Sequence, residues 1–498
     1  MSSGPPPHQH RAPAGSGGRS VLADPETSRY CTAGCPHRQG PTEARLEFPT
    51  TAAAQVGGYL ECVGCPAADG RAEPSGAGPS SVARAVRLVA AGEVERSGAA
   101  GVAVRLGRGA GELDADLRAE LGVGLLALAR AERVRTARVL LECTALPVAA
   151  VAAAAGFGSA RQLGATLWSV TGASPQALRA AARPCGEAVG RHRSELIDGP
   201  GTVLDLPLPF RPPLLPDSLF GHLAATAVPG VEEWRDGAYR RTLRLPHGWA
   251  VVTLHPPAPG ITSVPCRLRL SDLRDLRPAV AACRFLLDLD ADPQTVDGDL
   301  SADPALAPLV AAGPGRRVPR TVDGHELALR AVLGQQVSTA AARTHAGRLV
   351  RTHGAPVPDP DGGLTHLFPD AATLRGLDPQ ALALPTARRR TVAALLDALT
   401  GGALDPHRGA DPATVRGQLT ALPGVGPWTA GTVLMRALGD DDVFLEHDLG
   451  IRSAADRLGL PRTPGALRGR AVQWSPWRSY AVQHLWATGE HAVNTLPG

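Results

Sequence analysis

Residues 421–430 read ALPGVGPWTA, and this stretch sets the expectation for the C-terminal part of the chain. An apolar helical run precedes the two glycines and a helical run follows them, which predicts two helices joined by a tight hairpin. Gly424 and Gly426 have no Cβ, so their backbone N–H groups can approach a phosphate closely. Such contacts hold a nucleic acid by its backbone without reading its bases. Because Gly-x-Gly turns are common, the interpretation depends on the surrounding residues.

The composition indicates a large protein of mixed secondary structure that contains no lysine. Its 498 residues exceed one ordinary domain, and 44% of them are apolar, which is enough for several cores. The net charge of +4 carries no strong electrostatic signature. All 51 residues counted as Lys or Arg are arginines, because the sequence contains no lysine. Only the N-terminal amine could therefore form a Schiff base.

The sequence predicts a cytoplasmic protein that does not cross a membrane. Its first twenty residues lack the apolar segment of a signal peptide. The longest apolar run, around 145–158, is broken by Pro147 and Gly156 and is too short to span a bilayer. In a reducing compartment the eight cysteines favour metal ligation over a disulfide framework. We expect the chain to act as a monomer.

Changes in composition divide the chain, and the predicted fold class is multidomain, mainly α with an α+β part. Pro/Gly/Ser-rich stretches at 72–81 and 184–202 are typical of linkers. Short runs at 239–245, 249–255 and 264–270 predict strands. The expected divisions are a disordered leader (1–29), a cysteine-rich domain (30–72), a helical block (82–182), an α+β domain (203–315) and an all-α domain (320–498).

Four cysteines form two close pairs, Cys31-x3-Cys35 and Cys62-x2-Cys65, separated by 26 residues. Two thiol pairs in a short, loop-rich segment suit a tetrahedral zinc ion, whose bonds would stabilise a region too small to fold on its core alone. The alternative is a set of unrelated buried thiols. That alternative fits the remaining cysteines, which are scattered singly: Cys143, Cys185, Cys266 and Cys283.

The cysteine spacing resembles the zinc-thiolate domain of Ada-type alkylation-response proteins. In that family the first cysteine takes a methyl group from a DNA methylphosphotriester, which implies that Cys31 is the acceptor here. A zinc-bound thiolate stays ionised and nucleophilic, and its methylation removes one negative charge beside a DNA phosphate. The flanking residues depart from the family, since a low-complexity leader precedes Cys31 and Thr-Ala-Gly follows it. The Pro-Cys-His-Arg motif of the other Ada methyltransferase domain is missing, so O6-guanine repair is not expected.

Residues 146–179, LPVAAVAAAAGFGSARQLGATLWSVTGASPQALR, predict a helix, a turn and a second helix at about 159–170. This arrangement resembles the second DNA-binding unit of AraC-type regulators, which implies that Arg161 and Gln162 face the major groove. The alternative is a small helical bundle without a ligand. A first unit is expected at 82–120, but its stretch GAGELDADLRAEL is acidic and would repel phosphate.

Residues 420–490 resemble the helix-hairpin-helix DNA glycosylase family, and above all its AlkA-like 3-methyladenine DNA glycosylase II members. The match rests on the hairpin and on three further stretches: VFLEHDLGIR (443–452), WSPWRSYAVQHLW (474–486) and AVLGQQVS (331–338). The part from about residue 203 is similar to the β-rich N-terminal domain of the same enzymes. The resemblance covers roughly the last three hundred residues. It implies double-stranded DNA and alkylated purine bases as partners.

The family position of the catalytic aspartate falls on Asp448, 22 residues after Gly426. Cleavage of an N-glycosidic bond develops oxocarbenium charge on the sugar, which a nearby carboxylate stabilises while it positions water. Asp448 also has a simpler explanation, as the cap of a helix that begins near Leu449. The two are compatible, because a helix N-terminus favours the ionised carboxylate. Glu446 and residues 440–442 are expected to be solvated loop carboxylates.

Family members that also cut the DNA backbone carry a lysine where this chain has Trp428. Without any lysine, strand cleavage through an internal Schiff base is excluded. An N-alkylated purine is cationic, and the indoles of Trp428 and Trp486 could bind it after flipping by stacking and cation–π attraction. Such a base is a good leaving group and needs no strong general acid. Core packing is the alternative for both indoles, and it is what we expect for Trp474 and Trp477.

Several positions depart from the family or extend the resemblance. The wedge residue, which fills the gap left by a flipped base, is Gln336 in place of leucine. Thr432 and Ala487 stand where two pocket tyrosines are usual, which implies a roomier base pocket. The last cysteine is Cys283, so the iron–sulfur cluster of some relatives is not expected. By resemblance, a monovalent or divalent ion could bind the hairpin carbonyls of Thr420, Leu422 and Val425.

Together these patterns predict a fusion protein of alkylation repair. A zinc-thiolate domain and a helix-turn-helix block precede a monofunctional glycosylase that excises alkylated purines such as 3-methyladenine. One alternative is an Ada-like, methylation-sensing transcription activator whose glycosylase half only binds DNA, and the intact set of Asp448, Trp428 and Trp486 argues against it. Another alternative is a DNA-binding structural protein without catalytic activity. The absence of an aspartate at position 448 would have favoured this alternative, but the aspartate is present.

Overall fold

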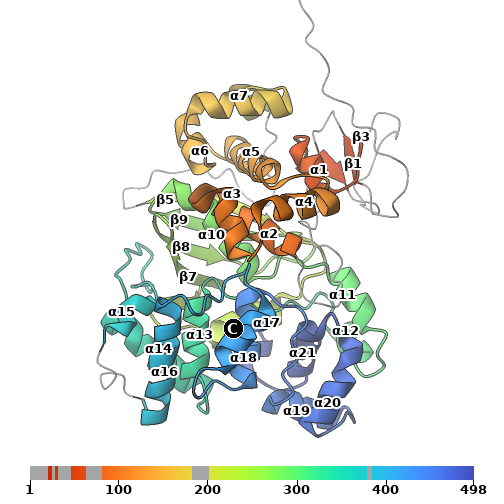
Figure 1. Cartoon of the computed structure of the whole chain (residues 1–498), viewed down its shortest axis with the longest axis vertical. Coiled ribbons are helices and arrows are strands. Elements are labelled where there is room, and N and C mark those ends of the chain that lie inside the picture. Colours follow the sequence, from red (N-terminus) through yellow and green to blue (C-terminus); the bar gives the residue numbers. More distant parts are fainter. Residues whose placement is uncertain are drawn as a thin grey trace, which may run out of the picture.

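The computed structural model describes residues 21–24, 29–31, 46–62, 81–181, 201–377 and 384–497. Within them the chain is mainly helical, with a small mixed sheet and a larger antiparallel sheet. Figure 1 shows the helices of the N-terminal half above the larger sheet and the C-terminal helices below it. Almost all of both predicted linkers and most of the predicted leader lie outside the described residues. The end of that leader is not disordered, because Val21–Asp24 forms a strand whose Val21 and Ala23 are buried, and it pairs with the strand that ends at Cys31.

The cysteine-rich segment contributes a sheet in the order β3-β1-β2-β4 and one short helix. Val21, Ala23 and Tyr30 pack with Ala54 of that helix in a small apolar core. The elements are β1 (Val21–Asp24), β2 (Arg29–Cys31), β3 (Leu46–Phe48), α1 (Thr51–Val56) and β4 (Leu60–Glu61).

The predicted helical block is confirmed. In its second unit, α6 and α7 are joined by a turn in which Gly156 adopts a left-handed φ of 79°, which glycine takes at little cost. The side chain of Ser159 caps α7 by accepting the N–H of Gln162. The helices are α2 (Ser81–Ala90), α3 (Glu93–Arg105), α4 (Ala110–Leu121), α5 (Leu125–Cys143), α6 (Val148–Ala154), α7 (Ala160–Thr171) and α8 (Pro175–Ala181).

The three predicted strand runs lie in an antiparallel sheet of order β5-β9-β8-β7-β6. In β9 the side chains of Val264, Cys266 and Leu268 are buried, whereas Arg267 is exposed, as alternation along a half-buried strand requires. The elements of this part are β5 (Thr202–Pro209), α9 (Pro216–Ala225), β6 (Glu232–Arg235), β7 (Ala238–Leu245), β8 (Gly248–Leu254), β9 (Ser263–Leu270), η2 (Leu273–Asp275) and α10 (Leu276–Leu286).

The remaining helices surround one large apolar core that extends from Val228 to Leu485. Across the described ranges, no helix has both the length and the apolar character needed to cross a bilayer. The elements are α11 (Pro293–Leu300), α12 (Ala307–Ala312), α13 (Gly324–Leu333), α14 (Thr339–His353), α15 (Ala371–Arg375), α16 (Thr386–Thr400), α17 (Pro412–Thr420), α18 (Pro427–Val433), η4 (Leu434–Leu438), α19 (Leu449–Arg457), α20 (Pro464–Ala471), η5 (Val472–Trp474), α21 (Arg478–Trp486) and η6 (Ala492–Asn494).

The helix-turn-helix block is joined to the rest of the molecule. Leu163 and Leu167 of α7 belong to the same buried apolar cluster as the inner face of the antiparallel sheet. On α2, Arg84 donates to the carbonyl of Gly409 at 2.6 Å, in the loop that leads into α17. On α3, Arg105 donates to Asp405 of the same loop at 3.0 Å.

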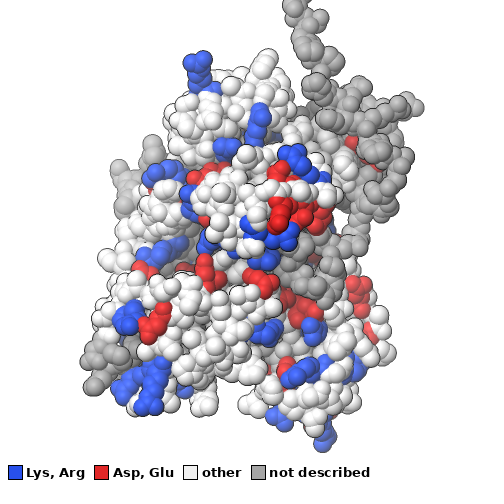
Figure 2. All heavy atoms as spheres, in the orientation of Figure 1, with Lys and Arg blue, Asp and Glu red and all other residues white. Residues whose placement is uncertain are grey.

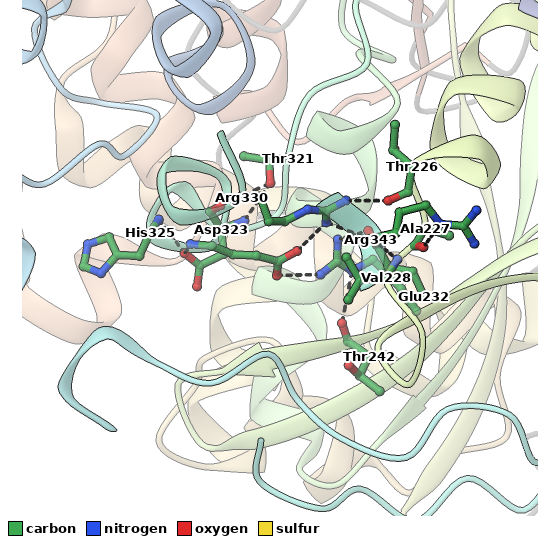
Figure 3. Close-up of polar contacts among 12 residues, drawn as sticks. Thr226, Ala227, Val228, Glu232, Thr242, Thr321, Asp323, His325, Arg330 and Arg343 are labelled. Atoms are coloured by element: carbon green, nitrogen blue, oxygen red, sulfur yellow. Dashed lines mark hydrogen bonds and ion pairs between the residues drawn. The ribbon is translucent and has the colours of Figure 1, made fainter. Parts of the chain in front are cut away.

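A buried network of charges joins the sheet to the C-terminal helices (Figure 3). Arg330 of α13 contacts Glu232 at 2.9 Å and Glu326 at 2.8 Å, and Arg241 of β7 contacts the same two carboxylates at 3.1 and 2.9 Å. Burial opposes ionisation of Glu232, but Arg330 and Arg241 outweigh that effect and lower its pKa to about 2. Glu232 therefore remains charged at neutral pH.

Candidate active site

The predicted hairpin lies between α17 and α18. Gly424 adopts a left-handed φ of 79°, and a Cβ on it would lie 2.2 Å from the Thr391 hydroxyl. Val425 N donates to the carbonyl of Leu422 at 3.2 Å, which closes the turn, and Gly426 begins α18 in an extended conformation. Glycine is required at Gly424 by both conformation and space. Gly424 is exposed and Gly426 is half-buried. Phosphate binding by their N–H groups stays a prediction.

Asp448 lies at the start of α19 and accepts hydrogen bonds from three N–H groups. Its Oδ1 accepts from the backbone of Ile451 at 3.0 Å, so it is the N-cap that the sequence also suggested. The same oxygen accepts from the indole of Trp486 at 2.8 Å, and Oδ2 accepts from the indole of Trp428 at 2.8 Å. Asp448 is half-buried, and its three donors fix the orientation of the carboxylate.

The four tryptophans of this region separate into two pairs, as predicted. Trp428 and Trp486 are half-buried, pack on the edge of the large core and direct their N–H groups to one carboxylate. Trp474 and Trp477 are 2% and 5% exposed, and their N–H groups donate to Asp303 and Asp299 inside the protein. The structure therefore assigns the second pair to the core.

The loop between α13 and α14 lies against the hairpin. Gln335 donates through Nε2 to the carbonyl of Gly424 and to the hydroxyl of Thr429, both at 3.0 Å. Gln336, the predicted wedge, is exposed and has a left-handed φ of 56°. A glutamine in this conformation is uncommon and strained. The structure thus divides the two glutamines, with Gln335 anchoring the loop and Gln336 directed to solvent.

Thr432 and Ala487, the predicted replacements for pocket tyrosines, lie on the same two helices as the indoles. Thr432 is 8% exposed and its hydroxyl donates to the carbonyl of Trp428 at 2.9 Å, one turn earlier in α18. Ala487 is half-buried and caps the end of α21 beside Trp486. Both side chains are small, so they add little bulk next to the indoles.

The expectation that Glu446 and residues 440–442 are solvated is wrong. Asp440 is 6% exposed, and burial raises its pKa. Asp441 pairs with the buried Arg320 at 2.5 Å, and Asp442 pairs with Arg478 at 2.6 Å. Glu446 pairs with Arg468 at 2.5 Å. The ion pairs of these carboxylates hold the segment before Asp448 against other parts of the chain. Spacing along the sequence could not predict these pairs.

Two of the four predicted zinc ligands are described, and they are neighbours. Strands β2 and β4 pair in parallel with Tyr30 opposite Glu61, and Cys62 N donates to the carbonyl of Tyr30 at 3.0 Å. The following residues, Cys31 and Cys62, are therefore adjacent across the pair. Cys35 and Cys65 lie outside the described residues. Within the described part, no group of three or more metal-ligating side chains is assembled. Cys266 and Cys283 are buried, as predicted.

The predicted recognition residues lie on the first turn of α7. Arg161 and Gln162 are both exposed, and Gln162 accepts the N–H of Gly158 at 2.8 Å, which fixes its side chain. In the first unit, Figure 2 shows acidic side chains gathered over α4. Arginines offset part of this charge, since Arg118 pairs with Asp114 at 2.7 Å.

Three residues of the site have no signal in the sequence. Gln335 is indistinguishable from its neighbour until the loop conformation is known. Leu449 follows Asp448, and its apolar side chain is 77% exposed. Gly450 lies against both Asp448 and Trp486. The contacts of Gln335 and Gly450 depend on packing between segments that are far apart in the sequence.

Comparison with known proteins agrees with this architecture. Residues 205–323 match the model of the AlkA N-terminal domain, and residues 102–181 match a helix-turn-helix domain. A Mycobacterium tuberculosis protein named "Probable bifunctional transcriptional activator/DNA repair enzyme AlkA" is 51% identical over 96% of this chain and 94% of its own. The chain belongs to the AlkA family.

Other members of the AlkA family are shorter. The Escherichia coli protein named DNA-3-methyladenine glycosylase 2 is 35% identical over 56% of this chain and 96% of its own length. Among solved structures, the 3-methyladenine DNA glycosylase of Archaeoglobus fulgidus has a TM-score of 0.49 and 19% identity, over 57% of this chain and 97% of that one. In this AlkA-family chain a helix-turn-helix domain precedes the part that is similar to the Escherichia coli glycosylase, as the sequence predicts.

Proposed function

We propose that this chain is a monofunctional DNA glycosylase that excises N-alkylated purines of the 3-methyladenine type, joined to a helix-turn-helix module that regulates transcription. One observation carries the repair function: the carboxylate of Asp448 accepts the N–H groups of both Trp428 and Trp486. This contact brings a charged group and two aromatic side chains together beside the backbone hairpin. We expect the protein to work as a monomer in the cytoplasm.

The carboxylate of Asp448 acts on the sugar. As the N-glycosidic bond breaks, positive charge develops on the deoxyribose ring, and a fixed carboxylate stabilises it and orients the attacking water. The two indoles and the N-terminus of α19 hold that carboxylate in one orientation. The carboxylate therefore has to move little during the reaction.

The base and the DNA backbone are bound by separate groups. The indole faces of Trp428 and Trp486 stack on a flipped cationic purine, while Thr432 and Ala487 leave room for its substituents. Gly424 and Gly426 hold the phosphates through backbone N–H groups, and Gln336 enters the gap in the duplex. The C-terminal end of α17 suits a cation, because the last carbonyls of a helix lack partners within it and carry partial negative charge. The carbonyls that would hold such an ion belong to Thr420, Leu422 and Val425.

The decisive experiment is incubation of the purified full chain with methylated duplex DNA. We expect free 3-methyladenine to be released, which chromatography of the soluble bases measures. If the glycosylase half only bound DNA, as in the alternative activator, duplex binding would occur without released base. That result would refute the repair function.

The strand should remain intact after excision. Because the chain has no lysine, an internal amine cannot form the Schiff base that strand cleavage requires. We expect DNA with an abasic site that breaks only after alkali treatment, and no borohydride-trapped adduct beyond that of the N-terminal amine. An efficient adduct that survives blocking of that amine would contradict the mechanism.

A zinc ion in the N-terminal domain is proposed from the pairing of Cys31 with Cys62 across β2 and β4. Cys35 and Cys65 complete the set of four thiols. A bound zinc ion would keep these thiols ionised, so that Cys31 could accept a methyl group from a DNA methylphosphotriester. Arg161 and Gln162 of α7 would then read the DNA that this module binds.

Replacement of Cys62 with serine tests zinc binding separately from the repair activity. We expect the purified variant to lose tightly bound zinc, as measured by elemental analysis, and to keep wild-type base excision, because the site around Asp448 lies in another part of the molecule. Wild-type protein that holds no zinc when purified without chelator would refute the metal site.

A further inference from the structure

Gly450 is the exposed second residue of α19, and a Cβ here would lie close to two side chains of the site. A Cβ built on it would lie 3.1 Å from Asp448 Oδ1, 3.1 Å from Trp486 Cδ1 and 3.4 Å from Trp486 Nε1. Real Cβ atoms rarely have neighbours this close, so Asp448 and Trp486 would have to move by a few tenths of an ångström. A methyl group here would therefore push on the two groups whose hydrogen bond defines the site.

The backbone does not explain a glycine at this position. Gly450 lies within a regular helix and is not among the glycines with left-handed φ. In an α-helix glycine is less favourable than alanine by about 1 kcal/mol, because it loses more backbone freedom on folding. Gly450 thus weakens α19, and the close approach of Asp448 and Trp486 is the reason for a glycine at this position.

We propose that Gly450 is a positioning residue: its missing Cβ allows the Trp486 N–H to reach Asp448 Oδ1 at 2.8 Å. It does not touch the substrate and acts only through this contact. The proposal rests on the proposed glycosylase function. It extends that function by adding a residue that fixes the orientation of the carboxylate relative to the sugar.

Gly450→Ala is the direct test, and Gly469→Ala is its matched control. Gly469 lies in α20, and a Cβ on it would meet no atom within 4 Å. Both changes add one methyl group to a helix, which by itself favours the helix. Gly469→Ala should therefore preserve or slightly raise the thermal midpoint, whereas in Gly450→Ala the displaced contact offsets that gain and the midpoint should change little. In single-turnover assays we expect Gly450→Ala to slow release of 3-methyladenine by about 10- to 100-fold, since small displacements of catalytic groups have effects of that size. Gly469→Ala should match the wild type, and both variants should bind an abasic-site analogue normally.

A double-mutant cycle with Trp486→Phe separates positioning from a general structural effect. Phenylalanine keeps an aromatic ring but has no N–H to donate. If Gly450 acts through that N–H, adding Gly450→Ala to Trp486→Phe should slow excision by about twofold or less. An equally large loss in both backgrounds, or wild-type excision by Gly450→Ala, would overturn the proposal.

A spectroscopic measurement distinguishes this proposal from failure of the proposed function. In ¹⁵N-labelled full chain, the indole N–H signal of Trp486 is assigned by its loss in Trp486→Phe. Gly450→Ala should move that signal towards the position of an indole without a carboxylate acceptor and leave the Trp428 signal in place. If the wild type released no alkylated base, the glycosylase function would fail while this shift could still occur. An unchanged Trp486 signal would refute the role of Gly450 in either case.

Discussion

Three N–H groups converge on the carboxylate of Asp448, one from the backbone and two from indoles. The carboxylate of Asp448 therefore both caps α19 and accepts the bonds that orient the side chain. An amide side chain in this place has one oxygen and one NH2 group, so at least one of the three donors would lose its acceptor. Replacement of Asp448 with asparagine therefore keeps the size of the side chain but removes its negative charge and one hydrogen bond.

Asp448→Asn should slow single-turnover excision of 3-methyladenine by about 10² or more, the loss seen when one preorganised electrostatic group is removed. Stability should fall by only about 1–2 kcal/mol, because most of the cap remains while one donor is left unpaired. Binding of an abasic-site analogue should change much less, since the hairpin supplies those contacts.

Asp370→Asn is the matched control for this change. Asp370 caps α15 by accepting from Thr373 at 2.7 Å and has no indole partner. It should show a similar small loss in a thermal melt and no loss of excision. Near-normal excision by folded Asp448→Asn would leave Asp448 as a helix cap only.

At the scale of single elements, α21 combines a site residue with a buried titratable group. His484, two positions before Trp486, is 1% exposed, and burial together with the charge of Arg316 lowers its pKa to about 3. The folded protein thus keeps this imidazole neutral at pH values where the unfolded chain already binds a proton. Its contribution to stability is full above the unfolded pKa of about 6.5 and is lost as the pH falls below that value.

His484→Leu should make stability less dependent on acid. Between about pH 6.5 and pH 3, one such histidine lowers the free energy of unfolding by about 1.4 kcal/mol per pH unit. Urea unfolding at about pH 7 and about pH 5.5 should give a smaller difference for the variant than for the wild type. Equal differences would show that His484 is protonated in the folded protein.

The elements that sequence patterns predicted are those with strong local signals. Turn glycines and a serine cap marked α7 and the hairpin, and alternation marked β9. Local patterns could not predict the partners of Asp440 and its neighbours, because Arg320 and Arg478 come from distant segments. The same limit applies to Gln335 and Gly450, whose roles depend on the distances between α13, α18, α19 and α21. The resemblance to a known family brought Asp448 and the two indoles together before any distance was known.

At the scale of the whole molecule, the network around Arg330 holds the sheet against the C-terminal helices. Arg330→Met should lower the free energy of unfolding by about 3–5 kcal/mol, because two buried carboxylates would lose a shared partner. Arg375→Met is the control, since Arg375 forms an exposed pair with Asp397 and should cost about 1 kcal/mol or less. Denaturant unfolding measures both. Equal costs would mean that the network adds no more than a surface ion pair.

The apolar cluster shared by α7 and the antiparallel sheet has a genetic consequence. A substitution such as Leu167→Ala leaves a cavity in this shared cluster, so it should lower the stability of both parts and reduce both activities in the same cell. Loss of folding in this cluster therefore cannot separate regulation from repair. Mutants that lose one activity and keep the other should instead carry exposed or site substitutions, at Arg161 on one side or Asp448 on the other.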